Sequence, residues 1–230
     1  VAAVSGATED KFQQLRDQAK ELGRTTQFSA TQAADAMGFL AMAGFKADEI
    51  LGAMPGTLQL AAAAQMDLGR AADIVSNILT GYGLEVEQLG HANDVLVKAM
   101  TSTNVDLEML GESMKYVGPV ASGMGLQFEE VAAAVGMLGN AGIQGSMAGT
   151  ALRGAISALV NPTKAAATRM DLLGIKALDS SGKMLPLDNI IRQLENSGAS
   201  AADMMALFGQ RAGPAMVALV DQGADSLANL

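Results

Sequence analysis

The chain has 230 residues with 15 basic and 24 acidic side chains, a formal net charge of −9 and no cysteine. Without cysteine it has no disulfide bond and no thiolate metal site, and the excess of negative charge argues against nucleic-acid binding, which needs clustered Lys and Arg. Half of the residues are apolar but only 3% are aromatic, and the abundant Ala, Leu and Met are strong helix formers, so the composition predicts an all-α fold.

A degenerate repeat of helix pairs, with a period of about 39 residues, is the first feature along the chain. Good N-cap residues stand at Ser29, Asp67 and Asp106, which are 38 and 39 residues apart. Apolar residues at helical spacing follow each cap. A glycine and a second helix start with an acidic first turn come next, at 44–50, 83–89 and 125–131. The pattern predicts a multi-helix domain of helix pairs, and the alternative is coincidence in an Ala-rich chain.

Shorter elements are predicted in the last third of the chain. Asn161 and Pro162 begin a helix that ends at Gly174. Apolar and polar residues alternate on either side of a turn, which predicts one small β-hairpin at 175–186. Further helices are expected at 187–196, at 200–208 and from residue 214 onward. We therefore divide the chain into a helical core with degenerate repeats, 1–160, and a smaller helical part with the hairpin, 161–230.

The segment Gly142–Arg153 looks like a phosphate-binding loop but lacks the residues that such a loop needs. A Walker-type loop has Lys and then Ser or Thr directly after its last glycine, because the ammonium reaches the phosphates and the hydroxyl binds magnesium. Here Thr150 and Ala151 follow Gly149, so the segment has neither the lysine for the phosphates nor the hydroxyl for magnesium at the required positions. We interpret the segment as a loop and helix whose small residues let another backbone approach closely. Anion binding at the helix N-terminus is the alternative.

Candidate catalytic and metal-binding residues are few. His91 is the single histidine, so it has no second His or Cys with which to share a metal, and we expect it on a helix surface or in a turn. No Gly-x-Ser-x-Gly motif presents a serine nucleophile. The carboxylate pairs 48–49 and 129–130 fall in predicted first helical turns, where the helix dipole explains them. We expect no catalytic, cofactor-binding or metal-binding residues, no cofactor and no enzymatic activity.

A membrane-spanning helix is not expected, because no apolar run reaches the roughly 18 residues that one needs. The longest candidate, 131–143, is interrupted by Gly136, Gly139 and Gly142. The sequence has no signal peptide, but it begins at Val1 without an initiator methionine, so we expect it to be an excerpt of a longer protein.

Several segments occur in a characteristic order along nearly the whole chain: Thr25–Met37, Leu40–Phe45, Gly142–Arg153, Leu173–Met184 and Phe208–Gly209. Together they resemble the conserved core region of bacteriophage tail tape measure proteins of the TP901 type. The specificity lies in the set of motifs and not in any single one. The resemblance carries over no catalytic residue.

The resemblance implies a structural component of a phage or prophage tail that takes part in tail length determination, tail assembly and DNA ejection. It implies tail tube proteins, tail tip or baseplate proteins and tail assembly chaperones as partners, a homo-oligomer in the tail, and transient contact with the host envelope. The expected location is the virion tail, and the bacterial cytoplasm during assembly. Two alternatives remain open: a membrane-active helical protein that inserts into the host envelope, and a cellular helical-repeat scaffold.

Overall fold

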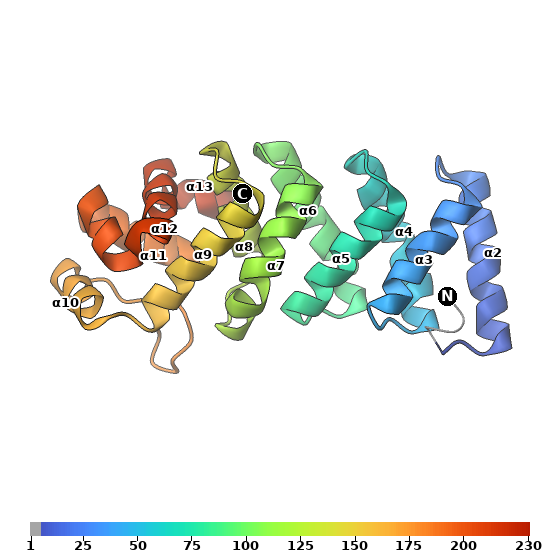
Figure 1. Cartoon of the computed structure of the whole chain (residues 1–230), viewed down its shortest axis with the longest axis horizontal. Helices are drawn as coiled ribbons and strands as arrows, with labels where there is room; N and C mark the ends of the chain where they lie inside the picture. The colour runs from blue at the N-terminus through green and yellow to red at the C-terminus, as the bar shows by residue number, and fades with distance from the viewer. Residues whose placement is uncertain (1–5) are drawn as a thin grey trace. The chain divides into compact units, whose positions relative to one another are not determined.

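The computed structural model describes residues 6–230, and within that range the chain forms twelve α-helices, one short 3₁₀ helix and no β-sheet (Figure 1). The prediction of an all-α fold is therefore confirmed. The elements are α2 (Glu9–Thr25), α3 (Ala30–Met42), α4 (Ala47–Ala63), α5 (Leu68–Tyr82), η1 (Val86–Gln88), α6 (Leu89–Ser102), α7 (Leu107–Gly123), α8 (Phe128–Asn140), α9 (Gly145–Val160), α10 (Lys164–Leu173), α11 (Leu187–Asn196), α12 (Ala201–Gln222) and α13 (Ala224–Asn229).

The chain divides into two compact units, Val1–Val97 and Lys98–Leu230. The boundary falls inside α6, so the first unit holds α2 to α5, η1 and the start of α6, and the second holds the remaining helices. Our division into a helical core with degenerate repeats, 1–160, and a smaller helical part with the hairpin, 161–230, stays a prediction.

In the first unit α3 packs against both α2 and α5, and α4 packs against α2, α3 and α5. Figure 1 shows these as blue to teal helices that run side by side. Small and branched apolar residues such as Ala33, Leu40 and Ile50 are fully buried in the contacts. Asn93 on α6 is an exception, because its side chain is polar, the residue is 7% exposed, and neither amide atom has a hydrogen-bond partner within the described residues. Asn93 is therefore an uncompensated polar residue in the core of this unit.

In the second unit the most extensive helix contact joins α7 and α9. Helix α9 also packs against α12, and α12 packs against α10. Helix α13 packs against α8 and α11. Gln222 near the end of α12 donates a hydrogen bond to the carbonyl oxygen of Met137 on α8, at 2.9 Å. The apolar residues that fill this core, Leu107, Val117 and Ile156 among them, are fully buried.

The helix starts confirm the predicted repeat. The side chains of Ser29, Asp67 and Asp106 accept hydrogen bonds from the backbone N–H groups three residues later and begin α3, α5 and α7. A fourth helix at the same spacing, α9, follows Gln144, which stands 38 residues after Asp106 but makes no cap hydrogen bond with its side chain. At the second helix start of each pair, a side chain accepts a hydrogen bond from the N–H group of the cap residue. The acceptors are Glu49 at 2.6 Å, Gln88 at 3.0 Å and Glu130 at 3.4 Å.

The predicted hairpin is present as an antiparallel loop with one β-bridge, between Leu178 and Met184, in place of two strands. Its turn is tied by the Asp179 carboxylate, which accepts from the N–H groups of Ser181 and Lys183 at 2.8 and 3.0 Å. The Met184 N–H donates outward to the carbonyl oxygen of Met124, at 3.2 Å. The bridge is made by the N–H groups of Asp179 and Leu185, which donate to the carbonyl oxygens of Lys183 and Ala177, both at 2.8 Å. The chain then enters α11, whose cap is Pro186.

Helix α12 is longer than predicted. The sequence analysis expected one helix to end at Phe208 and another to begin at Pro214. The structure instead has a local break at Gly209, whose φ of 74° and ψ of 178° lie outside the helical region. Helical backbone resumes directly afterwards, so Pro214 lies inside the helix and not at its first position. The first boundary was predicted correctly, and the second was placed a few residues too late.

Proline inside α4 is compensated by a neighbouring helix. Pro55 has no N–H for the carbonyl oxygen of Leu51, one turn earlier. The side-chain amide of Gln18 on α2 donates to that oxygen at 2.8 Å. The contact between α2 and α4 therefore replaces the hydrogen bond that the proline removes.

Candidate functional site

Segment Gly142–Arg153 joins α8 to α9, and its glycines sit where the backbone requires them. Gly142 has φ of 78° and Gly145 has φ of 54°, a left-handed conformation that side chains disfavour. The loop is held by amide side chains: Asn140 accepts from the Asn104 N–H, and Gln144 donates to the Asn104 carbonyl oxygen, both at 2.8 Å. The loop is therefore fixed against the turn before α7.

Gly149 is the point at which α9 meets the backbone of α7. A Cβ atom at this position would overlap the Ser113 carbonyl oxygen and lie 2.8 Å from the Ser113 Cα. The Ser113 hydroxyl lies 2.8 Å from the carbonyl oxygens of Met109 and Gly145, so it can bond its own helix or the first turn of α9. Two helices thus come into backbone contact, as the interpretation of this segment as a packing element requires.

Arg153 and Arg211 are the cations near this segment. The Arg153 guanidinium lies 5.9 Å from the centre of the Tyr116 ring, within the range of a cation–π contact. Arg211 on α12 borders a groove of about 440 Å³ whose other walls include Ile143, Met147 and Pro214. Arg153 is the only charged residue of the segment itself. Sequence reasoning could not find Arg211, because a helix distant in sequence supplies it.

Carboxylates that acid–base chemistry could use are engaged by their own helix starts. Glu49 and Glu130 accept from the cap N–H groups of α4 and α8. Burial raises the pKa of Glu130 above its usual value, and the nearby Asp188 carboxylate adds to the rise. These contacts agree with the interpretation that the helix starts account for the acidic pairs.

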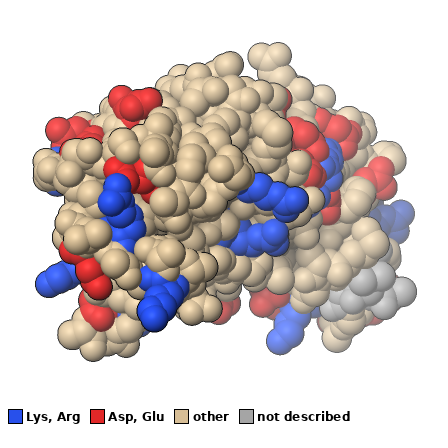
Figure 2. Space-filling model, turned by 60° about the vertical axis from the view of Figure 1, so that its left-hand side comes forward, with Lys and Arg blue, Asp and Glu red and all other residues tan. Residues whose placement is uncertain are grey.

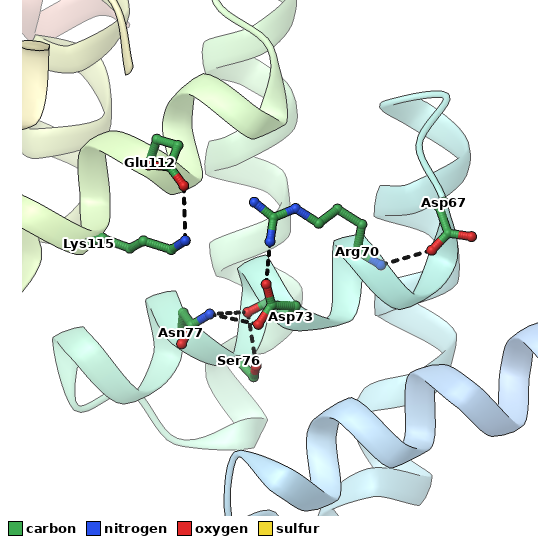
Figure 3. A network of polar contacts seen from close by, with 7 residues as sticks. All are labelled: Asp67, Arg70, Asp73, Ser76, Asn77, Glu112 and Lys115. Atoms are coloured by element: carbon green, nitrogen blue, oxygen red, sulfur yellow. Dashed lines mark hydrogen bonds and ion pairs between the residues drawn. The ribbon is translucent and has the colours of Figure 1, made fainter. Parts of the chain in front are cut away.

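Each of three repeat helices carries an acidic residue six positions after its cap: Asp35, Asp73 and Glu112. In the first unit Asp73 pairs with Arg70 and accepts from the Asn77 amide at 3.0 Å (Figure 3). In the second unit Glu112 pairs with Lys115 at 2.9 Å. The partners in both pairs lie three residues away on the same helix, so these carboxylates are neutralised locally.

Asp203 is the carboxylate with the most strongly altered pKa. It accepts from the Arg169 guanidinium Nε at 2.7 Å and from the Ser200 hydroxyl at 2.8 Å. These bonds, that of Arg169 first, lower the pKa of Asp203 to about 2. The capping box at Ser200 was visible in the sequence. The link from α10 to α12 was not, since Arg169 and Asp203 are 34 residues apart.

His91 lies on the exposed side of the first turn of α6. In the part of the chain that the structure describes, no three His, Asp or Glu side chains are grouped so that they could hold a metal ion. Figure 2 shows one face of the molecule, where basic and acidic side chains alternate and wide areas carry neither. Among residues 6–230 no helix is long and apolar enough to cross a membrane. The expected absence of catalytic, cofactor and metal sites stays a prediction.

Comparison with known proteins identifies the family. The model of the phage-related minor tail protein family matches residues 16–210. The chain belongs to this family. It is 42% identical over 233 residues to the tape measure protein of Pneumococcus phage Dp-1, which covers 99% of the chain and 20% of the relative. It is 34% identical over 228 residues to the probable tape measure protein of Escherichia phage P2, which covers 95% of the chain and 28% of the relative. No solved structure matches the chain.

These findings confirm the resemblance to tape measure proteins. They give no support to a membrane-active protein or to a cellular scaffold. The chain spans between a fifth and three tenths of the length of these relatives, so the activity of a whole relative does not transfer to it directly.

Proposed function

We propose that this chain is the core region of a tape measure protein and a structural component of a phage or prophage tail. In that role it takes part in tail length determination, tail assembly and DNA ejection. The family match over residues 16–210 carries the proposal. The similarity to two tape measure proteins over nearly the whole chain supports it.

The folded chain is suited to making contacts and poorly suited to measuring length. A continuous helix of 230 residues would extend about 345 Å at 1.5 Å per residue. The helices here are short: the longest without a break have 17 residues, and the 22 residues of α12 are interrupted at Gly209. The folded form would therefore serve assembly, and a role in length or ejection would require the helix pairs to open into an extended string.

The partners that fit this function are tail tube proteins, tail tip or baseplate proteins and tail assembly chaperones. The protein would act as a homo-oligomer in the tail and touch the host envelope transiently during ejection. It would be present in the bacterial cytoplasm during assembly and in the virion afterwards. It would have no enzymatic activity and no specific nucleic-acid binding.

Electron microscopy of phage tails tests the proposal. In-frame deletion of this region should abolish tails or change their length. Gly149→Leu, which disturbs the fold without changing chain length, should reduce the yield of normal tails. Gly154→Ala is the matched control, because a Cβ there would lie 3.4 Å from the Ala212 Cβ, at ordinary contact distance. Tails of normal number and length after the deletion would contradict a role in the tail.

A substitution at His91 tests the absence of chemistry separately. His91 is the single histidine of the chain, so no second histidine can share a metal with it, and His91→Ala should leave phage titre unchanged. A loss of infectivity with normally assembled tails would point to a chemical role for this residue.

A further inference from the structure

Helix α2 has the same place in the repeat as the second helix of each pair. Its cap, Thr8, stands 38 residues before Lys46, the cap of α4. We call α2, α4 and α8 second-type helices, and α3, α5, α7 and α9 first-type helices. Equivalent positions are those with equal distance from the cap. This alignment allows each surface of α2 and α3 to be compared with its equivalent deeper in the chain.

An open groove lies between α2 and α3, with a volume of about 360 Å³. Leu15, Ala19 and Met37 are buried and form its floor. Ala30 and Ala34 form the wall on α3. The floor and this wall are therefore apolar.

The groove lies on the side of α3 that faces away from α5. Phe39, which contacts Gly69 on α5, is nine residues after Ala30 and so points about 180° away from it. On α5 the residues equivalent to Ala30 and Ala34 are Leu68 and Ala72, and both are fully buried.

A first-type helix covers this equivalent face in both units. In the first unit α3 packs against α5, and in the second unit α7 packs against α9, where Gly149 is the equivalent of Ala34. The face of α3 that lines the groove is therefore equivalent to faces of α5 and α9 that an α-helix covers.

The edge of the groove on α2 is basic where the same edge of α4 is apolar. Arg16 and Lys20 line it, one helical turn apart. Their equivalents on α4 are Met54 and Leu58, and both are buried. Lys20 lies 3.7 Å from Asp17, with both side chains more than half exposed, and such an exposed pair is weak. The two cations are therefore available to carboxylates of a bound helix.

We propose that this groove binds an acidic amphipathic α-helix that places two carboxylates one turn apart against Arg16 and Lys20. The helix comes from the same polypeptide, outside residues 1–230. The curated relatives are several times longer than this chain, which fills 20% and 28% of them. A tethered helix binds at high effective concentration, so a groove of this size with two exposed ion pairs suffices. This binding does not require the proposed tail function.

Carbodiimide cross-linking of the full-length protein tests the proposal, because it joins an amine to a carboxylate only when they touch. Lys20 should be linked to an Asp or Glu outside residues 1–230 of the same copy. Lys11, which pairs with Asp48, provides an internal positive control in the same digest. A mixture of isotope-labelled and unlabelled protein distinguishes links within a copy from links between copies. Links of Lys20 to another copy or another protein, or to Asp17 alone, or no Lys20 link when Lys11 is linked, would overturn the proposal.

Cysteine labelling gives a second readout, since residues 1–230 contain no cysteine. Thr31 is exposed in this structure and lines the groove. In the full-length protein, Thr31→Cys should react with a maleimide at least about tenfold more slowly than Ser180→Cys at an exposed turn. Adding Arg16→Glu and Lys20→Glu should remove this protection. Equal rates for the two cysteines before the charge reversal, or protection that persists after it, would contradict an acidic helix in the groove.

Discussion

Two equivalent helix contacts, α3 with α5 in the first unit and α7 with α9 in the second, use glycine in different ways. Both pairs join first-type helices at the same place in the repeat. At Gly69 on α5, an added Cβ would lie 2.9 Å from the edge of the Phe39 ring. At Gly149 on α9, it would overlap the backbone of Ser113.

The difference determines how far each contact can adapt. The Phe39 side chain is 38% exposed, so its ring can rotate away from an obstacle. The Ser113 backbone is part of α7 and cannot move without displacing the helix. The same repeat pattern therefore yields one adaptable contact and one rigid contact.

The largest expected effect is at the rigid contact. Gly149→Ala should lower the free energy of unfolding by about 3 kcal/mol, because overpacking against a backbone has no side-chain relief. Gly154→Ala, on the same helix with ordinary contact space, should gain about 0.5–1 kcal/mol from helix propensity. Thermal melting of both variants measures the difference. Equal melting temperatures would show that α7 and α9 do not touch at Gly149.

Asn93→Leu should stabilise the first unit. The buried amide lacks partners, so replacing it with an apolar side chain of similar size removes a desolvation penalty of about 1 kcal/mol or more. Asn77→Leu is the control, since the Asn77 amide donates to Asp73 at 3.0 Å and its loss should not stabilise. Chemical denaturation of both variants measures the changes. A destabilised Asn93→Leu would mean that the Asn93 amide has a partner in solution.

A smaller effect is expected at the adaptable contact. Gly69→Ala should cost about 1 kcal/mol or less, because the Phe39 ring can turn toward solvent. Adding Gly69→Ala to a Phe39→Ala background should cost nothing further. A double-mutant cycle of unfolding free energies measures the coupling, and purely additive costs would remove the ring contact from the account.

The last expected effect is present at neutral pH and is lost in acid. The pKa of Asp203 is lowered to about 2 by Arg169 and Ser200, so its contribution to stability is complete above the usual pKa of 3.8 and is lost as the pH falls toward 2. Asp203→Asn should lower the melting temperature at pH 7 and flatten its dependence on pH between about 4 and 2. An unchanged pH dependence in this variant would show that Arg169 does not hold the carboxylate in solution.

The sequence predicted the helix order well, because caps are local. The side-chain oxygens of Ser29, Asp67 and Asp106 accept hydrogen bonds from N–H groups in the first turn of their helices. Such caps can be recognised in the sequence without knowledge of the fold. The spacing of the repeat also places a fourth helix start at Gln144. It was not predicted, because glutamine is a weak cap residue. The hairpin was predicted from its turn. The segments on either side of that turn are short, and they pair through only one β-bridge.

Contacts between distant segments were not predictable in the same way. Segment Gly142–Arg153 was interpreted as a packing element, but nothing in the sequence pointed to Ser113 as the neighbour of Gly149. The pairs Gln18 with Leu51 and Arg169 with Asp203 depend on how helices are placed in space. The groove between α2 and α3 was not predictable either, because it depends on how the two helices pack and on which of their residues are buried.

Thermal melting of Gly149→Leu and Arg153→Ala, each with and without polyphosphate, tests most directly whether segment Gly142–Arg153 holds two helices together or binds an anion. The account predicts a large drop for Gly149→Leu that polyphosphate does not change. It predicts a small drop for Arg153→Ala, which loses an exposed contact with Tyr116. Equal drops in the two variants, or a stabilisation by polyphosphate that only Arg153→Ala abolishes, would contradict it.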